Sequence, residues 1–125
     1  MAKKCFLLVD NFSGIQVYSY EGRQISNPKF TGLRTEFLNQ NNIALSNDYL
    51  AIIDKAQGQS KQVRIFDIQT GKQIMDPVAH NMEIMEVHLN QLGLSDNRML
   101  AFVDRNHDLY ITLLKSRNLP DLHEF

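Results

Sequence analysis

The stretch that decides the fold is residues 62–89, which read QVRIFDIQTGKQIMDPVAHNMEIMEVHL. Residues 63–67 alternate apolar and polar side chains with a period of two, which predicts a half-buried strand. Thr70-Gly71-Lys72 follows as a turn in which glycine favours a positive φ. Ala79-His80 then precedes a spaced apolar segment that ends at Leu89. The order of strand, turn, histidine and second strand predicts antiparallel β structure.

This order resembles a WD repeat, in which a strand ends near Trp-Asp, a Thr-Gly turn follows, and Gly-His precedes another strand. Phe66 and Asp67 stand at the Trp-Asp position, and His80 stands at the histidine position. The resemblance implies that these three are structural WD-motif residues. It also implies that the histidine is buried and bonds an aspartate of the next tight turn. The position expected for this aspartate holds Asn106 if Thr112 stands at the next tryptophan position, and Phe12 if Tyr18 does. An incomplete hydrogen-bonded set is therefore expected.

One sequence pattern occurs three times along the chain. A short apolar run ends in an aspartate, and a polar loop and an alternating strand follow. The aspartates are 44 and 50 residues apart, and the strands that follow them start 48 and 46 residues apart. Propeller blades recur every 40–50 residues or so. The aspartates are Asp10, Asp54 and Asp104, and the strands start at Ile15, Val63 and Leu109.

We therefore predict an all-β chain that forms a partial WD40-like β-propeller with about three antiparallel blades. The blades are expected at residues 5–30, 42–76 and 82–115, within a propeller fragment that spans 1–115. Residues 116–125 show no blade pattern and are expected to form a flexible tail. Because a propeller needs roughly 4–8 blades to close, the ring is not expected to close.

The expected strands follow the apolar alternation between the turns. A rival interpretation is an amphipathic helix over Met82–Leu89 in a small α+β adaptor domain, and residues 36–38 fit a helical turn as well as a strand. The threefold repeat favours strands. They are expected at Phe6–Val9, Ile15–Tyr20, Gln24–Ser26, Asn42–Leu45, Leu50–Ile53, Val63–Ile68, Gln73–Met75, Ile84–Leu89, Met99–Val103 and Leu109–Leu114.

The core and the blade faces follow from the same alternation. Six positions are expected in the core, and an open fan would leave apolar residues of its end blades without neighbours. Ile15, Val17, Phe66 and Ile111 are expected to be buried only against neighbouring blades. The six core positions are Leu8, Ile52, Phe66, Val87, Phe102 and Ile111.

Composition sets wide limits on function. Of the 125 residues, 43% are hydrophobic and the net charge is −1, which is typical of a globular chain and does not indicate nucleic-acid binding. The apolar run that ends before Asp10 is too short to insert in a membrane. Cys5 is the only cysteine, so no internal disulfide can form and a reducing compartment is expected.

No set of residues indicates catalysis or a cofactor. The four histidines lack metal-ligand spacing, and we expect no metal and no cofactor. Asp10, Asp54 and Asp104 could serve acid–base chemistry in a carboxylate-using enzyme. The alternative, that each ends a strand and bonds nearby backbone amides, is preferred because neighbouring blades hold equivalent positions apart.

Three longer segments resemble a WD-repeat subunit of the ciliary transport trains, and most closely the intraflagellar transport protein 80 family of complex B. They are residues 9–23, residues 45–48 together with 54–56, and residues 101–112, within a resemblance that covers about 6–115. The resemblance implies part of the second propeller of that family.

The resemblance also implies a function. It implies a non-enzymatic scaffold and protein-interaction module of the intraflagellar transport machinery that supports cilium assembly. The implied partners are other complex B subunits and the remaining propeller blades, in the cytoplasm and at the cilium or basal body. The alternatives are a truncated isoform or small adaptor domain without a train-binding role, and the carboxylate-using enzyme.

Overall fold

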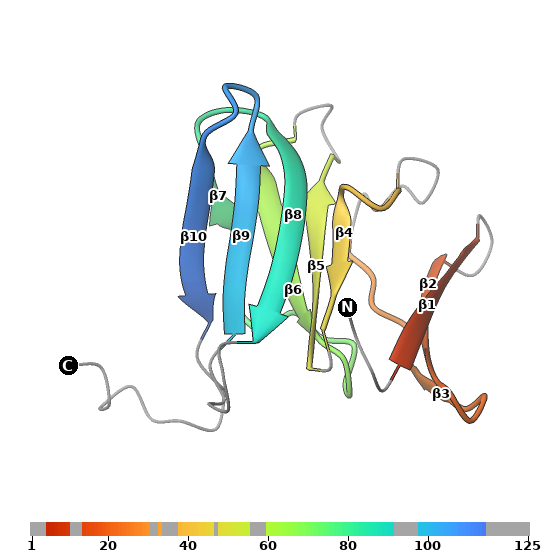
Figure 1. Ribbon diagram of the computed structural model, residues 1–125. Coiled ribbons are helices and arrows are strands. Elements are labelled where there is room, and N and C mark those ends of the chain that lie inside the picture. The colour runs from red at the N-terminus through yellow and green to blue at the C-terminus, as the bar shows by residue number, and fades with distance from the viewer. Residues whose placement is uncertain are drawn as a thin grey trace.

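The structure, a computed structural model, contains only β-strands as regular elements in the part of the chain that it describes. The strands form three antiparallel sheets (Figure 1). The prediction of an all-β chain with three antiparallel units is confirmed. The described residues are 5–10, 14–30, 33, 38–46, 48–55, 60–91 and 98–114.

Each sheet is built from strands that follow one another in the chain, as short antiparallel connections require. The first sheet has the order β1 (Cys5–Asp10), β2 (Gly14–Ser19), β3 (Gln24–Ser26). The central sheet has the order β4 (Ile43–Leu45), β5 (Tyr49–Asp54), β6 (Gln62–Asp67), β7 (Val78–Ala79). The third sheet has the order β10 (Leu109–Leu114), β9 (Arg98–Asp104), β8 (Ile84–Gln91).

The central sheet is covered on both faces, and in Figure 1 the third sheet lies in front of it. Every residue of β5 is buried, because alternate side chains enter two different cores. The core shared with the first sheet contains Cys5, Ile15, Val17, Leu50, Ile52, Phe66 and Ile68. The core shared with the third sheet contains Tyr49, Ala51, Ile53, Val63, Ile65, Ile84, Val87, Leu89, Leu100, Phe102 and Leu114.

The two outer sheets each keep one open face. Ile15 and Val17 are fully buried because they face the central sheet. Leu8 and Ile111 lie on the open faces and are 50% and 55% exposed. Their prediction as core residues is wrong, since no sheet in the described part of the chain covers the face on which each lies. The other predicted core positions are buried: Ile52, Phe66, Val87 and Phe102.

The observed strands match the predicted ones within two residues, with one exception. Gln73–Met75 is not a strand, since Gln73 makes only an isolated bridge with Phe66, and regular pairing resumes at β7. Pro77, which lacks an N–H, separates the bridge from β7. The alternative helix over Met82–Leu89 is wrong, because β8 is a strand. The predicted tail and half of residues 31–42, namely 31, 32 and 34–37, lie outside the described residues.

Candidate functional site

Asp67, at the end of β6, organises the turn that follows this strand. Its carboxylate accepts a hydrogen bond from the Thr70 hydroxyl (3.1 Å). Its backbone carbonyl accepts one from the Gly71 N–H (2.8 Å), and its own N–H donates to the Lys72 carbonyl (2.9 Å). Gly71 has a φ of 72°, in the left-handed region that favours glycine. The Thr-Gly turn is thus fixed by the aspartate before it.

Phe66 is a packing residue of the interface between the first and central sheets. Its side chain is fully enclosed in the core that these sheets share. Its ring stacks on Phe30, with 5.9 Å between the ring centroids. The Arg64 guanidinium, which also contacts Asp54, lies 4.8 Å from the centroid of the same Phe30 ring. Phe66 therefore packs in the contact between the first and central sheets.

His80 connects the outer edge of the central sheet with the hairpin of the third sheet. Its Nε2 lies 3.0 Å from Oδ2 of Asp104, and both side chains are shielded from solvent. Its ring packs edge-on against Phe102 and Tyr110, with centroid distances of 5.2 and 4.4 Å. Because an ionised carboxylate only accepts hydrogen bonds, Nε2 is the protonated nitrogen in this contact.

The expected absence of an aspartate partner for His80 is therefore wrong. The partner is Asp104, two residues before the position that spacing indicated. Asn106 contributes its backbone N–H instead, which donates to Oδ1 of Asp104 (2.9 Å), as does that of Asp108 (3.0 Å). His107, with a φ of 68°, closes this tight turn. The spacing of residues along the sequence does not show that backbone N–H groups of this turn donate to the carboxylate of Asp104.

The hydrogen bond from His80 holds the pKa of Asp104 below its usual range. Burial acts in the opposite direction, and the N–H groups of Asp108 and Asn106 reinforce the lowering. Asp104 is therefore an ionised anchor for a turn and a neighbouring strand.

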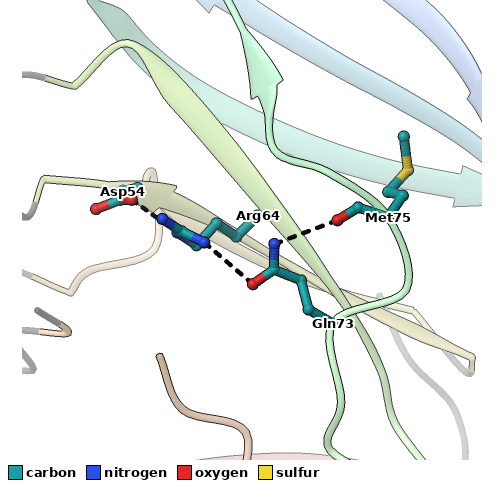
Figure 2. A network of polar contacts seen from close by, with 4 residues as sticks. All are labelled: Asp54, Arg64, Gln73 and Met75. Atoms are coloured by element: carbon teal, nitrogen blue, oxygen red, sulfur yellow. Dashed lines mark hydrogen bonds and ion pairs between the residues drawn. The ribbon is translucent and has the colours of Figure 1, made fainter. Parts of the chain in front are cut away.

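Asp54 holds the equivalent place in the central sheet and makes a different contact. Its Oδ2 lies 2.7 Å from Nε of Arg64, and Nη1 of Arg64 donates to Oε1 of Gln73 (3.1 Å). Gln73 in turn donates to the Met75 carbonyl (3.2 Å; Figure 2). This network ties the irregular segment after the turn to the two strands beside it. Asp54 and Asp104 thus belong to separate sheets and separate contacts. The side chain of Asp10 lies outside the described residues.

Among the described residues, no group of three or more His, Cys, Asp or Glu side chains is placed to hold a metal ion. No helix in the described part of the chain is long and apolar enough to cross a membrane.

The open faces of the outer sheets are the main apolar surfaces. On the third sheet, β10 presents Leu109, Ile111 and Leu113, each more than half exposed. These side chains share one face of the sheet, since strand residues two apart point the same way. On the first sheet, Leu8 is half exposed, and Phe6 stacks on Tyr18 across the β1–β2 pair (5.9 Å). Contiguous apolar surfaces of this kind mark protein contacts.

The family comparison covers nearly the whole chain. The model described as "IFT80 second beta-propeller" matches residues 1–124. The chain belongs to the IFT80 second beta-propeller family. The prediction of a partial β-propeller resembling this family is thereby confirmed.

Curated relatives of this IFT80-family chain agree. The chain is 50% identical over 116 residues to the intraflagellar transport protein 80 homolog of Rattus norvegicus, and 49% identical over 116 residues to that of Mus musculus. Each alignment covers 91% of this chain and 14% of the relative. The chain thus spans about one seventh of the length of these relatives.

Proposed function

We propose that this chain acts as a non-enzymatic scaffold and protein-interaction module of the intraflagellar transport machinery and supports cilium assembly. The observation that carries the proposal is the match to the IFT80 second beta-propeller over residues 1–124. The partners are other complex B subunits and the remaining propeller blades, and the sites of action are the cytoplasm and the cilium or basal body.

The surface chemistry supports contacts between proteins. The open face of β10 carries aliphatic side chains on a rigid sheet, including Ile111 and Leu113. The central sheet shows how such a face is used: its equivalent residues Val63 and Ile65 are completely covered by the third sheet. A further blade or a partner subunit would cover β10 in the same manner and exclude water from it.

The carboxylates support a structural role for the polar residues. Asp54 is paired with Arg64, Asp67 bonds the Thr70 hydroxyl, and Asp104 bonds His80. Each contact joins a strand to the turn or strand beside it. Two of the carboxylates that a carboxylate-using enzyme would need, Asp54 and Asp104, are therefore engaged in structural contacts.

A pull-down from ciliated cells tests the proposal. The baits are the 125-residue chain, its Ile111→Lys variant, and a complete second propeller from a curated relative. Recovered proteins are identified by mass spectrometry. We expect the chain to recover transport subunits, and Ile111→Lys to reduce their recovery at least fivefold. Met75→Lys is the matched control, because Met75 is an exposed apolar residue outside β10.

The outcomes separate the proposal from its alternatives. If the complete propeller recovers no transport subunits, the scaffold function is wrong. If only the complete propeller recovers them, the contacts require a closed ring, and this chain is a truncated product without a train-binding role. An equal loss with Met75→Lys would show that added charge anywhere on the chain, and not the β10 face, causes the effect.

A further inference from the structure

The two junctions between neighbouring sheets each contain a buried aspartate that holds a nitrogen donor. At the first junction, between the first and central sheets, Asp54 is paired with Arg64 (2.7 Å). At the second junction, between the central and third sheets, Asp104 contacts His80 (3.0 Å). Both aspartates are buried and end the strands β5 and β9. The two junctions can therefore be compared residue by residue.

Arg64 and Tyr110 occupy equivalent places in the central and third sheets. Arg64 lies opposite Ile52 of β5, and Tyr110 lies opposite Phe102 of β9, in each case two residues before the aspartate. The pKa of the Tyr110 hydroxyl is raised, first by burial and also by the charge of Asp104 and a hydrogen bond to it. A side chain at this place therefore reaches the aspartate of its own sheet.

The connectors, the segments that lead from one sheet into the next, are also equivalent. Residues 24–30 read QISNPKF before β4, and residues 73–80 read QIMDPVAH before β8. Phe30 follows the shared proline by two residues, and His80 follows it by three. Each connector thus presents one aromatic residue to the sheet that comes after it.

The nitrogen donor comes from a different side of each junction. At the first junction the connector supplies Phe30, which has no polar hydrogen, and the sheet supplies Arg64, whose guanidinium lies 4.8 Å from the ring centroid. At the second junction the connector supplies His80, and the sheet supplies Tyr110, whose ring centroid lies 4.4 Å from that of the imidazole. A connector without a donor thus meets an arginine, and a connector with a donor meets a second aromatic ring.

We infer that each connector selects the sheet that packs against it through this matched pair of residues. Phe30 fits a sheet that carries Arg64, and His80 fits a sheet that carries Tyr110. In an exchanged pairing, Phe30 would bring no nitrogen donor to Asp104, and a buried carboxylate that loses a donor is costly. Discrimination of this kind depends on the cost of the wrong partner as well as on the contacts of the right one. The inference rests on the two junctions and not on the transport role proposed above.

A double-mutant cycle at the second junction tests the inference with the whole 125-residue chain. His80→Phe gives the second connector the residue of the first, and it should lower the urea midpoint because Asp104 loses its donor. Adding Tyr110→Arg supplies a guanidinium from the place that Arg64 holds in the central sheet. The double variant should recover at least half of the lost midpoint. With His80 in place, Tyr110→Arg should shift the midpoint less than half as much as His80→Phe does.

Thr112→Arg is the matched control for the added charge. Thr112 is exposed and shares a face of β10 with Tyr110, but it lies opposite Leu100, further from Asp104 along β9. Combined with His80→Phe, it adds the same charge out of reach of the aspartate. This double variant should recover none of the lost midpoint.

The reverse exchange at the first junction should have the opposite outcome. Arg64→Tyr gives the central sheet the residue of the third sheet, and the Phe30 connector has no donor to replace the guanidinium. It should lower the urea midpoint at least twice as much as Tyr110→Arg does. Because Arg64 also donates to Gln73, Gln73→Ala is measured beside it and should account for less than half of the loss.

Three results would overturn the inference. They are the absence of recovery when Tyr110→Arg joins His80→Phe, an equal recovery with Thr112→Arg, and a loss from Arg64→Tyr that Gln73→Ala reproduces in full. If His80→Phe alone does not fold, a double variant with Tyr110→Arg that folds supports the inference, and one that does not fold overturns it. None of these results bears on recovery of transport subunits, so failure here leaves the scaffold proposal standing.

Discussion

The central and third sheets place equivalent residues in opposite environments. Val63 and Ile65 of β6 are fully buried, whereas Leu109 and Ile111, at the same positions of β10, are more than half exposed. Both strands alternate in the same way and pair with the preceding strand in the same register. The difference lies in the neighbours, because the third sheet covers β6 and no described segment covers β10. Burial in this architecture is thus a property of the stack rather than of the single sheet.

The largest expected effect comes from truncating, one at a time, the residue that lies two positions before the repeated aspartate in each sheet, which is Leu8, Ile52 or Phe102. Phe102→Ala should lower the free energy of unfolding by about 3–5 kcal/mol, and Ile52→Ala by about 2–5 kcal/mol, because both remove buried side chains. Leu8→Ala should cost only about 0.5 kcal/mol or less, since Leu8 lies on an open face. Urea unfolding followed by circular dichroism measures all three. An equally large loss for Leu8→Ala would show that something covers the first sheet in solution.

The second test compares the two strands directly. Ile65→Ala should lower the free energy of unfolding by about 2–5 kcal/mol, because it leaves a cavity between two sheets. Ile111→Ala, at the equivalent place on β10, should change it by about 0.5 kcal/mol or less. The measurement is again the urea midpoint, at several protein concentrations. A cost for Ile111→Ala that grows with concentration would mean that copies of the chain cover this face for one another.

Whether a feature of the fold or of the site could be predicted from the sequence depends on whether the cause of that feature is local in the chain. The strands and turns follow from alternation and from residues such as Gly71, so their bounds were predictable. Leu8 and Ile111 were misplaced because the same alternation occurs whether or not a neighbour covers the face. The Asp104 partner of His80 was missed because it depends on how a turn folds around a carboxylate. A groove lined by residues of β1, β4 and β8 arises only where strands of three sheets meet, which no single stretch of sequence encodes.

The third test compares a turn that meets another sheet with one that does not. Gly22→Ala and Gly71→Ala both force alanine into a positive φ, of 89° and 72°, which costs about 1–2 kcal/mol. At Gly71 an added Cβ would also lie 3.3 Å from Cβ of Ser26 in the first sheet, whereas at Gly22 it meets open space. Gly71→Ala should therefore destabilise more in a thermal unfolding scan. Equal effects would mean that the first and central sheets move apart freely at this point.

The smallest expected effect concerns Asp104 and appears as a pH dependence. Its pKa is lowered in the folded state, first by the hydrogen bond from His80. The folded state therefore binds this proton more weakly than the unfolded state does. The stability that Asp104 contributes should be complete above its ordinary pKa of about 3.9 and should be lost as the pH falls through the lower folded value.

Urea midpoints of the wild type and of Asp104→Asn between pH 3 and pH 7 measure this contribution. Asparagine cannot ionise, so the variant should be less stable than the wild type at pH 7 and should approach it as the pH falls. Asp108→Asn is the control, because Asp108 lies in the same turn but is exposed, and its backbone N–H, not its carboxylate, contacts Asp104. A gap between Asp104→Asn and the wild type that stays constant down to pH 3 would show that the carboxylate holds the third sheet to His80 by shape alone. A gap that closes would show that the contact between these two sheets at His80 depends on the charge of Asp104. The contact that buries Ile65 is, by contrast, purely apolar.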